Sequence, residues 1–277
     1  MPDLPPLLLY GIGTDLPPTQ DVAARAARHG VSAEGYVSWQ RICIAGPDDH
    51  PAAMGHRALE GALAEAGIAA DELGLVLFTG TSRDYLPSWS VATEIMRLIG
   101  APATCFGLDM TLGCGATLSA MELAQGWLAP RGRGTVAIIA AERWSQTVDM
   151  ANPASRRTWA WADGAAAAVM GAGLDRPARA AFLGAEFRTH AEYNGHILVR
   201  YGGTREPVAP GGTDPFARTV SDRPSAEIRA TYVDGYRTAR DALTARLGLT
   251  ARQLVCNQMS PALVRMIADC LEVPEAA

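Results

Sequence analysis

Residues 108–121 read LDMTLGCGATLSAM, and this stretch predicts a strand–turn–helix unit and the place where chemistry is expected. Its apolar start predicts a strand that ends near Met110, and the small residues from Ala116 onward predict a helix. The Gly-Cys-Gly between them predicts a tight turn, because glycine permits sharp bends and close approach of other groups. Cys114 is therefore expected at a helix N-terminus, where amide groups and the helix dipole stabilise a thiolate and lower the thiol pKa from its usual ~8.5.

Local physics leaves two interpretations of Cys114 open. Free cysteines are among the most frequently buried residues, so the first interpretation is a small side chain packed in a turn. The flanking glycines and the strand–turn–helix context favour the other, a nucleophile whose own N–H group can also donate to an acyl oxyanion.

Outward from this turn, short apolar runs alternate with helical patterns. Strands are expected over residues 7–12, 75–79, 105–110, 135–141 and 165–170, and helices over residues 56–66, 88–99 and 116–128. This order predicts an α/β fold with buried, mostly parallel strands. Gly11-Ile-Gly13 lacks the third glycine of a dinucleotide-binding loop, because Leu16 stands there, and is expected to be a turn.

One internal match suggests a repeat. Residues 62–73 read ALAEAGIAADEL and residues 243–254 read LTARLGLTARQL, each with a helix end, a glycine stop and an expected strand. Any helix–glycine–strand unit looks similar, so coincidence is the alternative. Taken as a repeat, the match predicts two α/β halves over residues 1–173 and 174–277. Residues 201–225, rich in Gly, Pro, Thr and Asp, are expected to form a surface excursion.

The composition excludes several functions. The 277 residues carry a formal net charge of −5 and contain no lysine, which argues against nucleic-acid binding and removes Schiff-base chemistry. No run approaches the ~18–20 apolar residues of a membrane-spanning helix. The five cysteines form no CxxC pair, so neither a disulfide framework nor a metal site is expected. The acidic, proline-rich start is unlike a signal peptide, and a cytoplasmic protein is predicted.

Several segments together resemble the ketoacyl-acyl-carrier-protein synthase III branch of the thiolase superfamily over nearly the whole chain. These are GIGTDLP at residues 11–17, the segment at residues 62–82, Tyr85-Leu-Pro-Ser, DMTLGCGAT at residues 109–117 and WADGAAAAV at residues 161–169. The resemblance implies a five-layer α/β/α/β/α fold of two pseudo-repeats, the second incomplete at its C-terminal edge. It also implies a homodimer that pairs through residues 105–110.

The activity implied by the resemblance is transfer of an acyl group to Cys114 and then to a second substrate. The acyl donor would be an acyl-CoA or an acyl carrier protein with its pantetheine arm, and no bound cofactor or metal is expected. The implied substrate contacts are Tyr36, Trp39, Arg41, Leu86, Trp161 and Arg265. For the first three of these, a packed aromatic cluster with a solvated arginine is an equally open interpretation.

Two departures from the family pattern concern the second half. The family's catalytic histidine slot falls in Cys256-Asn257-Gln258-Met259-Ser260, so Asn257 occupies it. An amide can donate a hydrogen bond but cannot act as a general base. The family's third catalytic residue and a glycine-rich strand would follow Ala277, where the sequence ends. A truncated chain, a partner subunit that completes the site and a differently built site all stay open.

The sequence therefore predicts an acyltransferase, expected in bacterial specialised metabolism of the polyketide type. One alternative is a non-catalytic or half-catalytic partner subunit of a condensing heterodimer, which would bury Cys114. The other is a decarboxylative condensing enzyme with a rebuilt base, for which His190 or His196 would have to reach the thiol. Both histidines are expected to make only local hydrogen bonds, and Asp163 is expected to be structural.

Overall fold

The computed structural model describes residues 4, 6–86, 88–214, 218–221 and 223–273. Pro87 of the Tyr85–Ser88 motif, parts of the expected excursion at residues 201–225 and most of residues 1–5 lie outside the described residues. The described chain forms two compact units. Unit 1 comprises residues up to Thr19, Cys43–Trp144 and Ala162–Gly184, and unit 2 comprises Gln20–Ile42, Ser145–Trp161 and Ala185 onward. Unit 2 takes two short segments from residues 1–173, and unit 1 includes residues 174–184.

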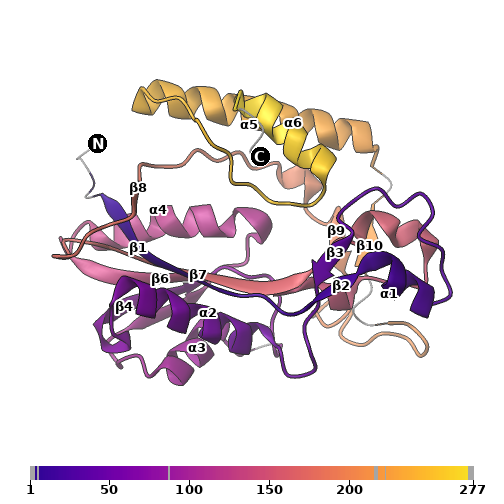
Figure 1. Cartoon of the computed structure of the whole chain (residues 1–277), viewed down its shortest axis with the longest axis horizontal. Coiled ribbons are helices and arrows are strands. Elements are labelled where there is room, and N and C mark those ends of the chain that lie inside the picture. Colours follow the sequence, from indigo (N-terminus) through magenta and orange to yellow (C-terminus); the bar gives the residue numbers. More distant parts are fainter. Residues whose placement is uncertain (1–3, 5, 87, 215–217, 222, 274–277) are drawn as a thin grey trace. The chain divides into compact units, whose positions relative to one another are not determined.

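Unit 1 is built on a six-stranded sheet with the order β5-β4-β6-β7-β1-β8. Its strands are β1 Leu7–Asp15, β4 Leu73–Phe78, β5 Phe106–Asp109, β6 Gly134–Arg143, β7 Asp163–Ala172 and β8 Ala180–Phe182. The helices α2 Pro51–Ala66 and α3 Val91–Ile99 cover one face, and α4 Ala116–Leu128 covers the other (Figure 1). The mixed α/β fold predicted from the sequence is confirmed.

Alternating side chains explain why the sheet is buried on both faces. In β4, Val76 and Phe78 join the core under α2 and α3, while Leu75 and Leu77 join the core under α4. Adjacent residues of a strand point to opposite faces, so a continuous apolar run fills both cores. All four side chains are at most 3% exposed, so this strand is firmly held.

The expectation of mostly parallel strands is wrong. β5, β4 and β6 run parallel, but β7 is antiparallel to β6, β1 is antiparallel to β7, and β8 is antiparallel to β1. Parallel neighbours need a crossover that is usually an α-helix. The described connection from β6 to β7 contains only the short 3-10 helices Trp144–Thr147 and Pro153–Thr158, so the chain returns in the opposite direction.

The expected turn at Gly11–Gly13 is also wrong, because both glycines lie within β1. A Cβ atom at Gly11 would lie 2.3 Å from the Ala62 carbonyl oxygen, and one at Gly13 would lie 2.0 Å from that of Ala58. The glycines therefore allow α2 to pack directly on the backbone of β1. Their function is close packing, not nucleotide binding.

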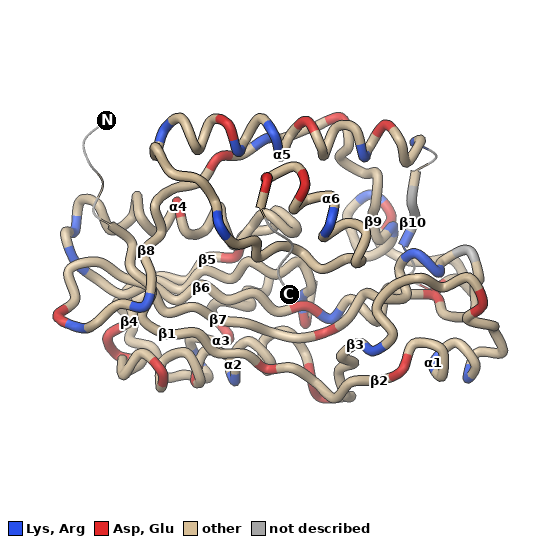
Figure 2. Tube along the Cα trace, turned by 45° about the horizontal axis from the view of Figure 1, so that its top comes forward, with Lys and Arg blue, Asp and Glu red and all other residues tan. Residues whose placement is uncertain are grey.

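Unit 2 contains α1 Val22–Arg28, α5 Ser225–Leu247 and α6 Pro261–Leu271. Strands β2 Thr19–Asp21 and β3 Arg41–Cys43 form one two-stranded sheet, and β9 Ile197–Val199 and β10 Arg218–Val220 form another. A 3-10 helix spans Ala191–Tyr193. The α5 helix carries acidic and basic residues interspersed along its length (Figure 2).

The second large sheet of a five-layer fold is not formed by the described residues of unit 2. Gly248 ends α5 in the left-handed conformation as expected, with φ of 66°, but residues 249–259 form neither helix nor strand. Most of their side chains are exposed. Without a buried apolar run or a partner strand, the strand expected near Leu254 does not form.

Candidate functional site

Between β5 and α4, Cys114 lies in a short 3-10 helix, Gly113–Gly115, that leads directly into α4. The Met110 N–H donates to the Phe78 carbonyl oxygen at 2.7 Å, which ties the end of the strand to β4. Gly113 then adopts φ of 60°, a conformation that favours glycine. Gly115 has the ordinary right-handed values of −83° and −9°, so its backbone does not require glycine. A Cβ atom at either glycine would meet no atom within 4 Å, and the space beside the cysteine is open.

The first turn of α4 is held from beneath by two threonines. Thr79, only 3% exposed, follows β4, and its hydroxyl lies 3.0 Å from the hydroxyl of Thr117. The Thr79 hydroxyl also donates to the Ile139 carbonyl oxygen at 3.2 Å. No side chain caps the α4 N-terminus at Gly115. The arrangement fixes the helix start and leaves its amide end available for an oxyanion.

The Cys114 thiol is exposed, whereas Cys105 and Cys270 are buried and Cys43 and Cys256 are half-buried. The expectation that its pKa is lowered is wrong. Desolvation by the surrounding protein atoms raises the pKa of Cys114, and the Glu142 carboxylate raises it further, against a smaller lowering by a backbone hydrogen bond. Both effects disfavour the thiolate form of Cys114.

Glu142 is a site residue that the sequence analysis missed. Its carboxylate accepts hydrogen bonds from the Thr81 N–H at 2.7 Å, the Ser82 N–H at 2.9 Å and the Ser82 hydroxyl at 2.7 Å. These hydrogen bonds fix the loop after β4 next to the turn that carries Cys114. An acidic residue placed directly after the buried run at residues 135–141 was the signal that could have revealed it.

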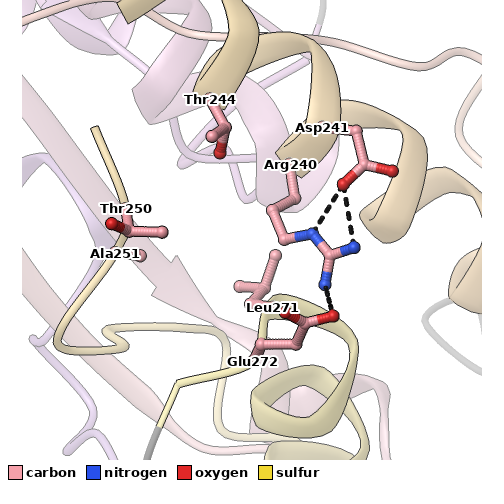
Figure 3. A pocket seen from close by; sticks show the side chains of 7 residues that line it. All are labelled: Arg240, Asp241, Thr244, Thr250, Ala251, Leu271 and Glu272. Carbon is pink, nitrogen blue, oxygen red and sulfur yellow. Dashed lines mark hydrogen bonds and ion pairs between the residues drawn. The ribbon is translucent and has the colours of Figure 1, made fainter. Parts of the chain in front are cut away.

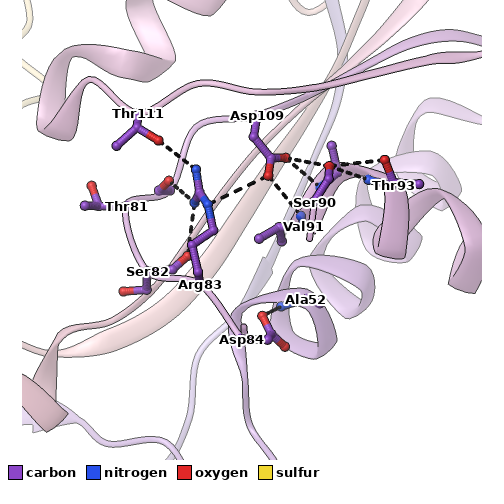
Figure 4. A network of polar contacts seen from close by, with 12 residues as sticks. Ala52, Thr81, Ser82, Arg83, Asp84, Ser90, Val91, Thr93, Asp109 and Thr111 are labelled. Atoms are coloured by element: carbon purple, nitrogen blue, oxygen red, sulfur yellow. Dashed lines mark hydrogen bonds and ion pairs between the residues drawn. The ribbon is translucent and has the colours of Figure 1, made fainter. Parts of the chain in front are cut away.

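A second network joins the same loop to the strand before Cys114 (Figure 4). Arg83 donates to the Gly80 carbonyl oxygen at 2.6 Å and to the Thr111 hydroxyl at 2.8 Å, and it lies 3.7 Å from Asp109. Asp109 also accepts hydrogen bonds from the first amides of α3, at Val91 and Ala92. The Arg83 side chain is only 11% exposed, so this network is structural support for the turn.

The predicted substrate contacts are divided between the two units. Leu86 belongs to unit 1 and lies in the loop after β4 with 68% of its side chain exposed. The other contacts, Tyr36, Trp39, Arg41, Trp161 and Arg265, belong to unit 2 together with Asn257. Arg41 lies on β3 and Arg265 on α6, and both are exposed. Cys114 belongs to unit 1, and its expected partner Asn257 does not.

Within unit 2, the structure brings the aromatic residues to the segment that carries Asn257. The Tyr36 hydroxyl donates to the Trp39 carbonyl oxygen, and the Trp39 indole N–H donates to the Gln258 carbonyl oxygen, both at 2.7 Å. The Tyr36 ring also lies 5.8 Å from the ring of buried Trp159. Trp39 thus holds the backbone next to the exposed Asn257.

The histidines and Asp163 make the local contacts expected of them. His190 lies 3.3 Å from Glu192, and the His196 ring nitrogen lies 2.6 Å from the Ser221 hydroxyl. Asp163 is 4% exposed and accepts a hydrogen bond from the Ala45 N–H at 2.8 Å.

A separate hollow of about 190 Å³ lies in unit 2 (Figure 3). It is lined by Arg240, Asp241, Thr244, Thr250, Ala251, Leu271 and Glu272. The Arg240 guanidinium is paired with Asp241 at 2.8 Å and with Glu272 at 2.6 Å, and it donates to the Cys270 carbonyl oxygen. These contacts tie α5 to α6 and indicate a structural role. Across the described part of the chain, no group of three or more His, Cys, Asp and Glu side chains is arranged to hold a metal ion, and no helix is long and apolar enough to span a membrane.

Cys114 is thus an exposed cysteine between a strand and a helix start. The family model for 3-oxoacyl-[acyl-carrier-protein] synthase III matches residues 108–191, which include Cys114. A β-ketoacyl-[acyl-carrier-protein] synthase III from Granulibacter bethesdensis is 28% identical over 96% of this chain and 81% of the relative. Synthase III 1 from Streptomyces coelicolor is 32% identical, over 46% of this chain and 36% of its own length.

The similarity in structure extends further than the similarity in sequence. A crystal structure of a 3-oxoacyl-(acyl-carrier-protein) synthase III superposes with a TM-score of 0.80, covering 98% of this chain and 84% of that one at 21% identity. The chain is thus similar in sequence and in fold to the ketoacyl-acyl-carrier-protein synthase III-like branch of the thiolase superfamily.

Proposed function

We propose that this protein is a thioester-dependent acyltransferase that carries the acyl group on Cys114. The observation that supports it is the exposed thiol at an uncapped helix start, on a turn held by Thr79 and Glu142. The donor is an acyl-CoA or an acyl carrier protein, and the product of the second step belongs to polyketide-type metabolism.

The loading step follows from the chemistry of the turn. The Cys114 sulfur attacks the thioester carbonyl carbon, its proton is lost, and the amide end of α4 stabilises the negative oxygen that forms. Collapse of this intermediate expels the donor thiolate, which takes up a proton, and leaves an acyl group on Cys114. Since the pKa of this thiol is raised, loading is expected to become faster as the pH increases.

The second step depends on the acceptor. Asn257 in the family's histidine position can hold a carbonyl oxygen but cannot remove a proton. Acyl transfer to an oxygen, nitrogen or sulfur nucleophile that brings its own basicity therefore fits the chain better than decarboxylative condensation. The local partners of His190 and His196 give no support to a rebuilt base, and the exposed Cys114 argues against a non-catalytic subunit.

Intact-protein mass spectrometry tests the proposal. The whole chain is incubated with a panel of acyl-CoA thioesters, and each spectrum is searched for the mass of one acyl group. A single adduct with at least one donor is expected. No adduct with any acyl-CoA or acyl carrier protein would refute the acyltransferase.

The β5 edge supports a further proposal, a homodimer in which two β5 strands pair. β5 is at one end of the six-stranded sheet, and Phe106 and Leu108 expose 56% and 39% of their side chains there. An apolar strand edge tends to acquire a partner strand. Light scattering should give twice the chain mass at micromolar concentration, and Phe106→Asp should give a monomer. A monomeric wild-type chain would contradict the dimer.

A further inference from the structure

Unit 2 contains an arginine that lies on a tryptophan and forms no ion pair with any described residue. The Arg218 guanidinium carbon is 3.4 Å from the centre of the Trp161 ring, and both side chains are half-buried. Arg218 lies on β10, and Trp161 comes just before β7. Two segments distant in sequence thus meet at one cation–π contact.

Two of the three side-chain nitrogens of Arg218 are buried without a hydrogen bond. Its Nε and Nη1 atoms are shielded from solvent and have no hydrogen-bond partner among the described residues. Desolvation lowers the pKa of Arg218 to about 10, with no carboxylate acting against it.

Arg240 in the same unit shows the usual alternative. Its guanidinium is paired with Asp241 and Glu272, as Figure 3 shows, and these contacts raise the pKa of Arg240. When an arginine only joins helices or strands, its guanidinium N–H groups are hydrogen-bonded in this way. Arg218 lacks such partners, so its fold contacts do not account for its buried charge.

The chemistry of the side chain defines the missing partner. A guanidinium held flat on an aromatic ring keeps its N–H groups in a fixed plane, and such groups match the oxygens of a carboxylate or phosphate. An anion at this place would neutralise the buried charge and fill both free donors. Thioester substrates offer two sources, the phosphates of the carrier arm and a carboxylate at the far end of an acyl group.

We propose that Arg218, held on the ring of Trp161, is a binding residue for an anionic oxygen group of the substrate. This inference rests on the proposed thioester chemistry for its biological ligand, but the anion site itself can be tested without catalysis. The Trp161 ring orients the guanidinium.

Calorimetric titration of the whole chain provides the first test. Glutarate represents a carboxylate source and pyrophosphate a phosphate source. At least one of them is expected to bind the wild-type chain, and Arg218→Gln should weaken that binding at least tenfold, with Arg218→Lys intermediate. Arg229→Gln, which removes the same charge from an exposed position on α5, should leave it unchanged. The site is refuted if neither anion binds, or if Arg229→Gln weakens binding as much as Arg218→Gln.

Thermal unfolding separates binding from structural support. Without an added anion, Arg218→Gln removes a buried charge that has no anionic partner among the described residues, so its melting temperature should equal or exceed that of the wild type. A clear decrease for both Arg218→Gln and Arg218→Lys would show that Arg218 is a fold contact and would overturn the inference.

Acylation by three donors then identifies the source of the anion. The acetyl thioester of N-acetylcysteamine has no anionic group, the glutaryl thioester adds a carboxylate, and acetyl-CoA adds phosphates. Arg218→Gln should slow loading by the donor with the recognised group and spare the acetyl thioester. If the wild-type chain is loaded by none of the three, the proposed function fails while the binding result stands.

Discussion

Two helices of this chain end alike and lead to different structures. α2 ends at Gly67 with φ of 61°, and α5 ends at Gly248 with φ of 66°. After Gly67 the chain enters β4, which pairs with β5 on one side and β6 on the other. After Gly248 it forms neither helix nor strand through residues 249–259. The glycine stop is a local property, whereas the strand requires partners.

The same difference separates the two parts of the predicted active site. Cys114 lies on a turn supported by buried strands and by the hydrogen bonds of Thr79 and Glu142. Asn257 lies on the segment without a strand, where the described hydrogen bond to its neighbour Gln258 comes from Trp39. The turn proposed to load the acyl group is thus preorganised, whereas the residue proposed for the second step has much weaker structural support.

The largest effect is expected at Asn257. Asn257→His restores a general base in the family position, and it should raise decarboxylative condensation with a malonyl thioester by a factor of ~10²–10⁴ over a slow wild-type rate. Rates of carbon dioxide release from acylated protein measure this. Gln258→His is the matched control and should have no such effect. A wild-type rate of ~1–10³ s⁻¹ would contradict the account.

A large difference in stability is expected between the corresponding leucines of the two helix–glycine units. Leu73 begins β4 and is 2% exposed, whereas Leu254 is half-buried in the segment after Gly248. Leu73→Ala should lower the free energy of unfolding of unit 1 by about 2–5 kcal/mol, because it leaves a cavity. Leu254→Ala should cost less than about 1 kcal/mol, because little buried contact is lost. Urea unfolding, monitored by amide hydrogen exchange in each unit, measures the loss of unfolding free energy in both variants. Equal losses would contradict the difference in burial between the two leucines.

A smaller effect is expected at Glu142. Its carboxylate raises the pKa of Cys114, so Glu142→Gln should lower that pKa and move the pH profile of acyl loading to lower pH. Glu142→Asp keeps the charge and should move the profile less. Loss of the loop contacts can reduce the loading rate at every pH. The test is therefore the pH at the midpoint of the loading profile and not the height of the profile. Glu122→Gln, at an exposed position of α4, is the control. A shift to higher pH, or an equal shift in the control, would contradict the role of Glu142.

Local sequence patterns were sufficient for much of unit 1. The helix expected at Ala116–Leu128 has those bounds in the structure, and the glycine stops after α2 and α3 are also confirmed. These features depend on residues within a few positions of one another. The direction of β7 could not be predicted from them, because it depends on which strand it meets.

The electrostatics of the site could not be predicted for the same reason. The sequence around Cys114 indicates a helix start and hence a lowered pKa. Desolvation by the folded protein raises the pKa instead, and Glu142, at the end of β6, raises it further. Likewise, nothing near Trp161 in the sequence announces Arg218. Residue pairs that meet only in the folded protein determine the pKa of Cys114 and the surroundings of Arg218. A single sequence shows the members of such a pair only as separate residues.

The central claim is that the supported turn makes Cys114 the acyl carrier among five cysteines. The most direct test is peptide mapping of the acylated wild-type chain together with intact masses of Cys114→Ala and of Cys43→Ala, the matched control. The account predicts one acyl group on the Cys114 peptide, none on Cys114→Ala and unchanged loading of Cys43→Ala. An acyl group of the same mass on Cys114→Ala would contradict it.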